Sequence, residues 1–162
     1  MTRPLQRDRQ LRARLTNLAR ESGAALLVGS IGTDTDSQGY VTDYYDSAFA
    51  IEPDGGWVGR YDKTHLVPFG EYLPLRGLIG SIAEAVATGI ADGDVTPGSR
   101  PFALDIALLG TLGAAPGEER VVRVGAPICY ELLFPDLVRR FVGDEAGVLL
   151  AITNDAWYGR TG

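Results

Sequence analysis

The sequence contains few of the residues that build disulfides and metal sites. One cysteine and one histidine occur among 162 residues, so an internal disulfide is excluded. The two side chains stand far apart in the sequence and make a poor ligand set, and we therefore expect no metal and no cofactor. No apolar run, Val148–Ile152 included, approaches the roughly 20 residues that cross a bilayer. Residues 1–5 lack the apolar core of a signal peptide.

An excess of basic residues is also missing. The chain has 15 Lys and Arg against 21 Asp and Glu, which gives a formal net charge of −6. Binding to nucleic-acid phosphates needs a basic surface, so we expect no nucleic-acid partner. The one basic concentration lies in the first twenty residues, where arginines alternate with leucines. That alternation is typical of the solvated face of a helix.

Hydrophobic patterning predicts helices and strands that follow one another along a single domain. A helix is expected over 8–22, where apolar residues recur at helical spacing before Gly23, and a buried strand over 24–31 before a polar loop over 32–39. Further strands are expected over 44–51, 57–61, 104–112, 121–128 and 148–153, and further helices over 78–86 and 132–142. Between them we expect a hairpin turn at 53–56, an irregular segment over 62–74, a loop over 92–101 and a turn over 114–119. Strands and helices that alternate in this way indicate a layered α/β fold.

Cys129 is the clearest candidate for chemistry. A predicted strand ends just before it and a predicted helix begins just after it, as in the nucleophile turn of serine hydrolases. The N–H groups at a helix start favour a thiolate and can stabilise an oxyanion. The alternative is that Cys129 is a small buried hydrophobic residue, as lone cysteines usually are.

A second candidate segment follows the strand over 57–61. Lys63 could stabilise an anion, and Glu71 could act as an acid, a base or an ion-pair partner of Lys63. Taken singly, both are more often surface residues. However, the apolar residues and two prolines around them favour a packed segment. His65 could pair with Cys129, but Lys63 is the better partner.

The third candidate segment follows the last predicted strand. Asn154, Asp155 and Trp157 stand where polar groups commonly line the active site of an α/β protein, at the carboxyl end of a central strand. The alternative is a turn stabilised by the Asn or Asp side chain, with Trp157 packed in the core.

Three phrases in this order resemble the carbon–nitrogen hydrolase (nitrilase) superfamily. They are YDKTHLVPFGEYLP from Tyr61, ICYE from Ile128 and TNDAWYG from Thr153. The first phrase, with eight residues from Lys63 to Glu71, is similar to the apolipoprotein N-acyltransferase branch of that superfamily. The likeness runs from about Asp8 to the last residue.

The resemblance implies an αββα sandwich of four layers and a Glu-Lys-Cys triad. It makes Cys129 the nucleophile and Lys63 the triad lysine, and it places Glu71, Tyr130 and Glu131 among further residues needed near the site. It also implies that the thiol takes an acyl chain from a membrane phospholipid as a thioester. The chain then passes to the N-terminal amino group of a lipidated apolipoprotein, on the periplasmic side of a bacterial inner membrane.

The chain departs from the family pattern in ways that suggest a fragment. Nothing resembling the family's glutamate phrase precedes the first predicted helix, and the family's membrane helices and the C-terminal part of its domain have no counterpart. Asp46 stands where the family usually has asparagine. We therefore expect 1–162 to be a partial domain, incomplete at both ends, soluble and inactive by itself.

Two other functions remain open from the sequence. A soluble amidase or nitrilase of the same superfamily would share the thiol chemistry but pass the acyl group to water. The third reading is a degenerate remnant or a binding module that keeps only the fold. The joint presence of Lys63, Glu71 and Cys129 argues against decay.

Overall fold

The structure, a computed structural model, describes residues 4–68, 71, 95–109 and 119–153. The predicted helix over 78–86 lies outside these residues, as does the predicted turn over 114–119 except for Glu119, which the structure places in a strand. A short 3-10 turn, η1 (Leu5–Arg7), opens the described chain. Within the described residues, no helix is long and apolar enough to cross a membrane.

Helix α1 (Arg9–Ser22) confirms the prediction for this segment. The Asp8 carboxylate caps its start by accepting a hydrogen bond from the N–H of Leu11 at 2.9 Å. Gly23 ends the helix in the left-handed region at φ 62°, where a residue without Cβ is least strained. The helix is tied to the neighbouring sheet because the Trp57 indole N–H donates to Thr16 Oγ1 at 3.0 Å.

The first sheet has three antiparallel strands in the order β1 (Leu26–Thr35), β2 (Val41–Ile51) and β3 (Trp57–Asp62). The hairpin predicted around 53–56 is confirmed, and the Asp54 carboxylate accepts from the N–H of Gly56 at 2.7 Å inside its turn. The prediction of a loop from residue 32 is wrong in part. Strand β1 continues to Thr35 because residues up to there pair with β2, for example Thr33 with Tyr44.

The second sheet has the order β4 (Leu104–Leu109), β5 (Glu119–Gly125) and β6 (Val148–Leu149), with β4 and β5 antiparallel and β5 and β6 parallel. Strand β5 ends three residues before the predicted end at 128. Pro127 has no N–H to donate to a ladder. Ile128 then forms a single parallel bridge with Ile152, so pairing beyond β6 is reduced to one bridge.

Segment 129–143 differs from the single helix predicted over 132–142. A 3-10 turn, η2 (Cys129–Leu133), comes first, and helix α4 (Pro135–Gly143) follows it. Proline fits the first turn of a helix but pushes the residue before it into an extended conformation. Phe134 accordingly has φ −111° and ψ 90° and separates the two elements.

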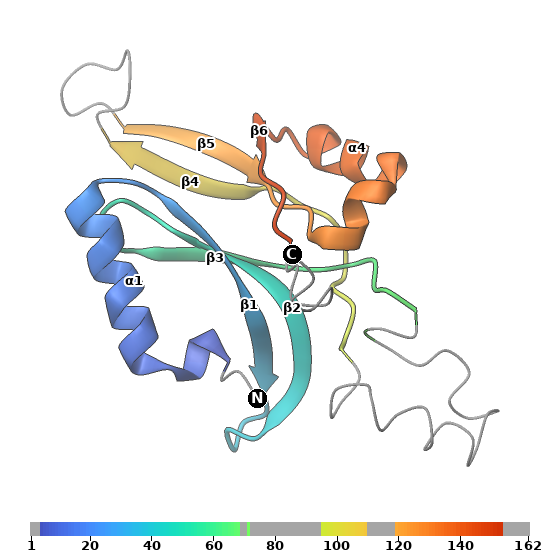
Figure 1. The fold of residues 1–162 in the computed structure, drawn as a ribbon, viewed down its shortest axis with the longest axis horizontal. Coiled ribbons are helices and arrows are strands. Elements are labelled where there is room, and N and C mark those ends of the chain that lie inside the picture. Colours follow the sequence, from blue (N-terminus) through green and yellow to red (C-terminus); the bar gives the residue numbers. More distant parts are fainter. Residues whose placement is uncertain (1–3, 69–70, 72–94, 110–118, 154–162) are drawn as a thin grey trace, which may run out of the picture.

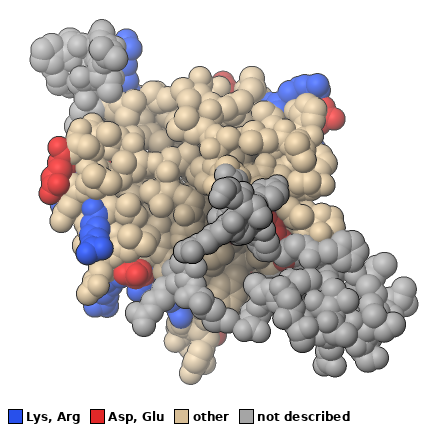
Figure 2. Space-filling view, viewed as in Figure 1, with Lys and Arg blue, Asp and Glu red and all other residues tan. Residues whose placement is uncertain are grey.

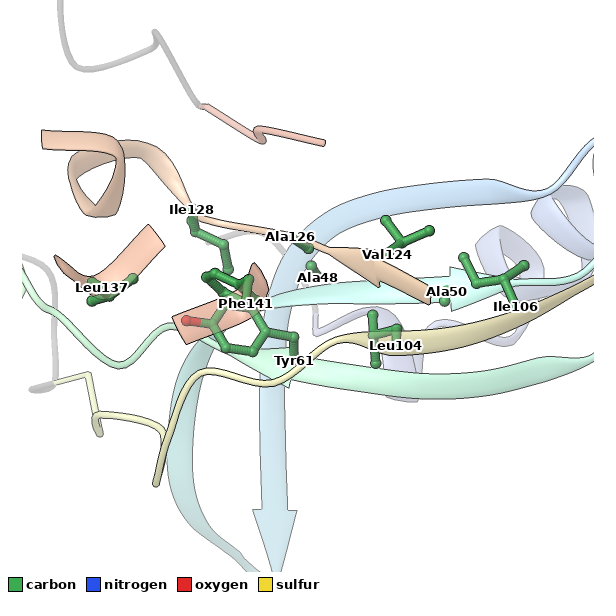
Figure 3. Packing of buried hydrophobic residues seen from close by; sticks show 10 residues of the cluster. All are labelled: Ala48, Ala50, Tyr61, Leu104, Ile106, Val124, Ala126, Ile128, Leu137 and Phe141. Atoms are coloured by element: carbon green, nitrogen blue, oxygen red, sulfur yellow. The ribbon is translucent and has the colours of Figure 1, made fainter. Parts of the chain in front are cut away.

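The layers follow from this arrangement. Helix α1 lies against the first sheet, the second sheet stacks on the other side, and α4 lies beside β5 and β6 (Figure 1). The core between them is drawn from both sheets and from α4 (Figure 3). Its buried members are Ala48, Ala50, Tyr61, Leu104, Ile106, Val124, Ala126, Ile128, Leu137 and Phe141. This arrangement is a layered α/β fold, as expected.

The core also fixes the ends of the elements that carry the site. Tyr61 lies one residue before the end of β3, and its ring meets that of Phe141 edge-on, with centroids 5.2 Å apart. Gly125, where β5 ends, leaves room for Phe141, because a Cβ there would lie 2.9 Å from Phe141 Cβ. The strand end before Lys63, the strand end before Cys129 and helix α4 are thus packed together.

Candidate active site

Cys129 occupies a sharp turn after β5. Its φ of 49° lies in the left-handed region, which costs a non-glycine residue of order 1–3 kcal/mol and persists only where the surroundings enforce it. The N–H of Cys129 donates to the carbonyl of Ile152 at 2.7 Å, which anchors the turn to the segment after β6. The side chain is a free thiol of intermediate exposure. The thiol is thus held half-exposed on a strained, anchored turn, where it also packs partly against the hydrophobic core.

The proposed help from a helix start is corrected by the structure. Only the five-residue 3-10 turn η2 follows the thiol, and α4 begins six residues later, at Pro135. The N–H of Cys129 is also already committed to Ile152. The described residues offer the N–H of Tyr130 no acceptor, so this group remains as the backbone donor next to the thiol.

Lys63 is fully buried. Its backbone N–H donates to the carbonyl of Asp46 at 2.8 Å, and its carbonyl accepts from the N–H of Gly98 at 2.8 Å. Its Nζ donates to Glu71 Oε1 and lies 3.9 Å from Asp46 Oδ2. A buried ammonium is costly unless it is paired, so the surface alternative for Lys63 is excluded.

Glu71 is the main partner of that ammonium. It is buried at 8% exposure, and its second carboxylate oxygen, Oε2, accepts from the N–H of Val67 at 2.9 Å. Its backbone carbonyl also accepts from the N–H of Val95 at 3.0 Å. Both carboxylate oxygens therefore have hydrogen-bond partners, and the structure pairs Glu71 with Lys63.

Glu131 links the lysine segment to the cysteine turn. It is fully buried, and Oε1 accepts from the Tyr61 hydroxyl and the Thr64 N–H, each at 2.8 Å. The Thr64 hydroxyl donates to the same oxygen at 2.9 Å and the His65 N–H at 3.1 Å. Oε2 accepts from the N–H of Ile128 at 2.8 Å. One carboxylate therefore joins residues on either side of Lys63 to the residue before Cys129.

Tyr61 is a supporting residue that sequence reasoning missed. Burial and the neighbouring Glu131 carboxylate raise the pKa of its phenol far above the usual value, so the hydroxyl stays protonated and donates. The signal available in the sequence was its place at the end of a predicted strand, as the first residue of the phrase that contains Lys63. Thr64 was missed in the same way.

Tyr130 and His65 belong to an aromatic group with Phe134. The ring centroids of His65 and Phe134 lie 3.9 Å apart, and those of Tyr130 and Phe134 lie 5.0 Å apart. His65 also lines a pocket of about 360 Å³ bounded by residues of the 98–101 segment and α4; neither Cys129 nor Lys63 borders it. His65 thus packs against aromatic rings, and among the described residues its side chain shows no hydrogen bond to the thiol.

The third segment of the predicted site is not among the residues that the structure describes. Asn154, Asp155 and Trp157 lie outside the described residues, so their assignment remains a prediction. Among the residues that the structure describes, no group of three or more His, Cys, Asp or Glu side chains could hold a metal ion.

Gly98 lets the backbone of the 95–101 segment approach the lysine segment. A Cβ at this position would collide with the backbone carbonyl of Asp62, which cannot swing aside as a side-chain end can. We expect Gly98→Ala to lower the free energy of unfolding by about 1–3 kcal/mol. Gly143→Ala is the matched control, since a Cβ there meets nothing within 4 Å. Urea denaturation of both variants checks this, and equal stability would contradict it.

Comparison with known proteins shows which family and which enzymes the chain is similar to. The carbon–nitrogen hydrolase family model matches residues 2–161. The apolipoprotein N-acyltransferase of Geobacter metallireducens is 40% identical over 149 residues, which are 92% of this chain and 25% of that protein. The enzyme of the same name from Rhizobium meliloti is 36% identical over 144 residues, 87% of this chain and 24% of that protein. The chain spans about a quarter of the length of the curated relatives it matches.

Solved structures share the fold at lower identity. A carbon–nitrogen hydrolase from Helicobacter pylori superposes with a TM-score of 0.55 at 18% identity, covering 89% of this chain and 37% of that one. An amidase from Nesterenkonia superposes with a TM-score of 0.54 at 21% identity, covering 97% of this chain and 49% of that one. Together with the match over nearly its whole length, these likenesses show that the chain belongs to the carbon–nitrogen hydrolase family.

Proposed function

We propose that this chain carries the nucleophile and supporting residues of an apolipoprotein N-acyltransferase. The observation that carries the proposal is the buried Lys63–Glu71 pair, whose neighbour Thr64 is tied through Glu131 by hydrogen bonds to the turn bearing Cys129. Such a constellation suits acyl transfer through a thiol, which needs a strained nucleophile and a fixed cation for the developing oxyanion. The curated relatives direct this chemistry toward acyl transfer to an amine.

In the first half-reaction, the sulfur of Cys129 attacks the ester carbonyl of a phospholipid. The C–S bond forms, the C–O bond to glycerol breaks, and the thiol proton ends on the departing lysophospholipid oxygen. Lys63 Nζ and the N–H of Tyr130 are the donors available for the oxyanion. Glu71 holds the ammonium in place through this step by its hydrogen bond.

In the second half-reaction, the free α-amino group of a lipidated N-terminal cysteine attacks the thioester. The C–N bond forms, the C–S bond breaks, and a proton from the amine returns to the sulfur of Cys129. The partners in this proposal are therefore a phospholipid donor and a lipidated apolipoprotein acceptor. The whole protein would work at the periplasmic face of a bacterial inner membrane.

Apolar side chains beside the thiol support a lipid donor. Leu132 and Leu133 follow Cys129 closely and are 46% and 69% exposed. Exposed apolar surface next to a reactive group favours an apolar ligand. On the face seen in Figure 2, residues other than Lys, Arg, Asp and Glu make up most of the described surface, and most of the visible charged side chains lie toward its edges.

The second candidate is an amidase that passes the acyl group to water. It is favoured by the amidases among the solved structures that share the fold. The two functions differ in the donor and in the acceptor: an acyltransferase needs an ester lipid and an amine, whereas an amidase needs an amide and water. The thiol and its lysine serve both reactions.

The deciding experiment supplies the protein with a phospholipid that carries a labelled acyl chain. We expect a hydroxylamine-sensitive label on Cys129 that moves to a lipopeptide with a free N-terminal amine and not to its N-acetylated form. Release of the label only as free fatty acid, together with hydrolysis of short amides, would instead establish the amidase. The expectation that the 162 residues are inactive alone stays a prediction, which turnover by this chain would refute.

A further inference from the structure

Asp46 contacts Lys63 through both its backbone and its side chain. It lies in β2, where its carbonyl accepts from the N–H of Lys63 at 2.8 Å. Its Oδ2 lies 3.9 Å from Lys63 Nζ, and its side chain is 29% exposed, whereas that of Lys63 is fully buried. Opposite Asp46 in β1 stands Ile31, which carries no charge. Asp46 is therefore a second carboxylate beside an ammonium that already has one.

Lys63, Asp46 and Glu71 form a cluster whose charges do not balance when both carboxyl groups are ionised. One ammonium then faces two carboxylates, and water screens them little because Lys63 and Glu71 are buried. Two carboxylates that share a site in this way favour a state in which one holds a proton. Both oxygens of Glu71 already accept hydrogen bonds, from Lys63 and from the N–H of Val67. The extra proton therefore belongs on Asp46.

The electrostatics of Asp46 agree with this assignment. Burial raises the pKa of its carboxyl to about 6; the charge of Glu71 adds to the rise and that of Lys63 opposes it. Among the described residues, Glu71 and Lys63 are the charged groups that act on it. The protonation change of Asp46 therefore falls near pH 6.

We propose that Asp46 is a positioning residue for Lys63, and that Asp46 and Glu71 share one exchangeable proton that decides whether the ammonium faces one carboxylate or two. With the proton present, Asp46 carries it and can donate it to Glu71, and Lys63 is held by the charge of Glu71 alone. With the proton lost, Asp46 draws the ammonium from a second side. The inference rests on the proposed function only for its effect on the thiol.

The effect on the thiol follows from the net charge. Loss of the shared proton leaves the cluster with one more negative charge, which opposes formation of a thiolate close by. An asparagine at 46 would keep the neutral state at every pH. Asp46→Asn is therefore expected to react faster than the natural protein only where the natural Asp46 is ionised, above about pH 6.

The test follows Asp46 and Lys63 directly by NMR. The carboxyl ¹³C signal of Asp46 and the ¹⁵N signal of Lys63 Nζ should shift with a common midpoint near pH 6. In Asp46→Asn the Lys63 step should vanish. In Asp43→Asn, a loss of the same charge three residues away in β2, the step should remain. An Asp46 midpoint near 4, or a Lys63 signal that ignores Asp46, would overturn the proposal.

A second measurement separates this inference from the proposed function. The measured quantity is the rate at which iodoacetamide alkylates Cys129 in Asp46→Asn, divided by the same rate in the natural protein. We expect this ratio to be near one at pH 5 and about three at pH 8. The ratio for Asp43→Asn should stay flat. If the NMR steps occur but the Asp46→Asn ratio does not change with pH, the result supports the shared proton. It contradicts the placement of Lys63 beside the thiol, on which the proposed function depends.

Discussion

Cys129→Ala is expected to abolish acylation of the protein. Cys129 is the only cysteine in the chain, so no second thiol can take over. Loss of the nucleophile in a cooperating group of residues costs several orders of magnitude, and we expect the rate to fall by at least about 10⁴-fold. The unsubstituted chain, incubated with an activated acyl ester, should gain the mass of one acyl group on Cys129 without turning that group over. Intact-protein mass spectrometry measures this gain directly.

The control for this prediction must separate lost chemistry from lost structure. Cys129→Ser keeps a similar volume at the strained position, but the hydroxyl is a far weaker nucleophile at neutral pH. Serine and alanine should both leave the protein folded, because the turn is fixed by the backbone hydrogen bond to Ile152 and not by the thiol. If the alanine variant still gains an acyl group of the same mass, the assignment of the nucleophile is wrong.

The parts of the fold that the sequence predicts are those decided by neighbouring residues. Helix α1 follows from a capping Asp8, leucines at helical spacing and Gly23 at its end. The β2–β3 hairpin follows from the turn residues between the strands. The extent of β1 is different, because the polar residues after Ile31 become strand only by pairing with a partner more than ten residues away.

In the candidate site, too, only the features that depend on neighbouring residues could be predicted from the sequence. The segment from Lys63 to Glu71 and the turn at Cys129 were found from short phrases, but their connection was not. The five hydrogen bonds to Glu131 come partly from donors more than sixty residues earlier in the chain. Complete burial of a lysine was equally hidden, because lysine is seldom buried unless paired and the sequence does not show the pairing.

Glu131→Ala is expected to cause the largest loss of stability among single substitutions in the site. Removal of the carboxylate leaves the Tyr61 hydroxyl and the N–H groups of Thr64, His65 and Ile128 without their acceptor in a buried region. Each unsatisfied buried donor costs about 1–3 kcal/mol, although relaxation and entering water recover part of the sum. We expect the free energy of unfolding to fall by about 3–5 kcal/mol, as for other broken buried charge networks. Urea denaturation measures the change.

Two further variants test whether the hydrogen bonds, and not the mere loss of a charge, hold the site together. Glu131→Gln keeps the shape and one carbonyl oxygen for the donors of the lysine segment, but its amide would meet the N–H of Ile128, donor against donor. The glutamine variant should therefore lose less stability than the alanine variant. It should still break the hydrogen bond that ties Ile128, before the cysteine turn, to residue 131. Glu21→Ala removes an exposed carboxylate from α1 and should change stability by less than about 0.5 kcal/mol. If Glu131→Ala is no less stable than Glu21→Ala, the carboxylate does not join the two segments. Both would then be held in place by core packing alone.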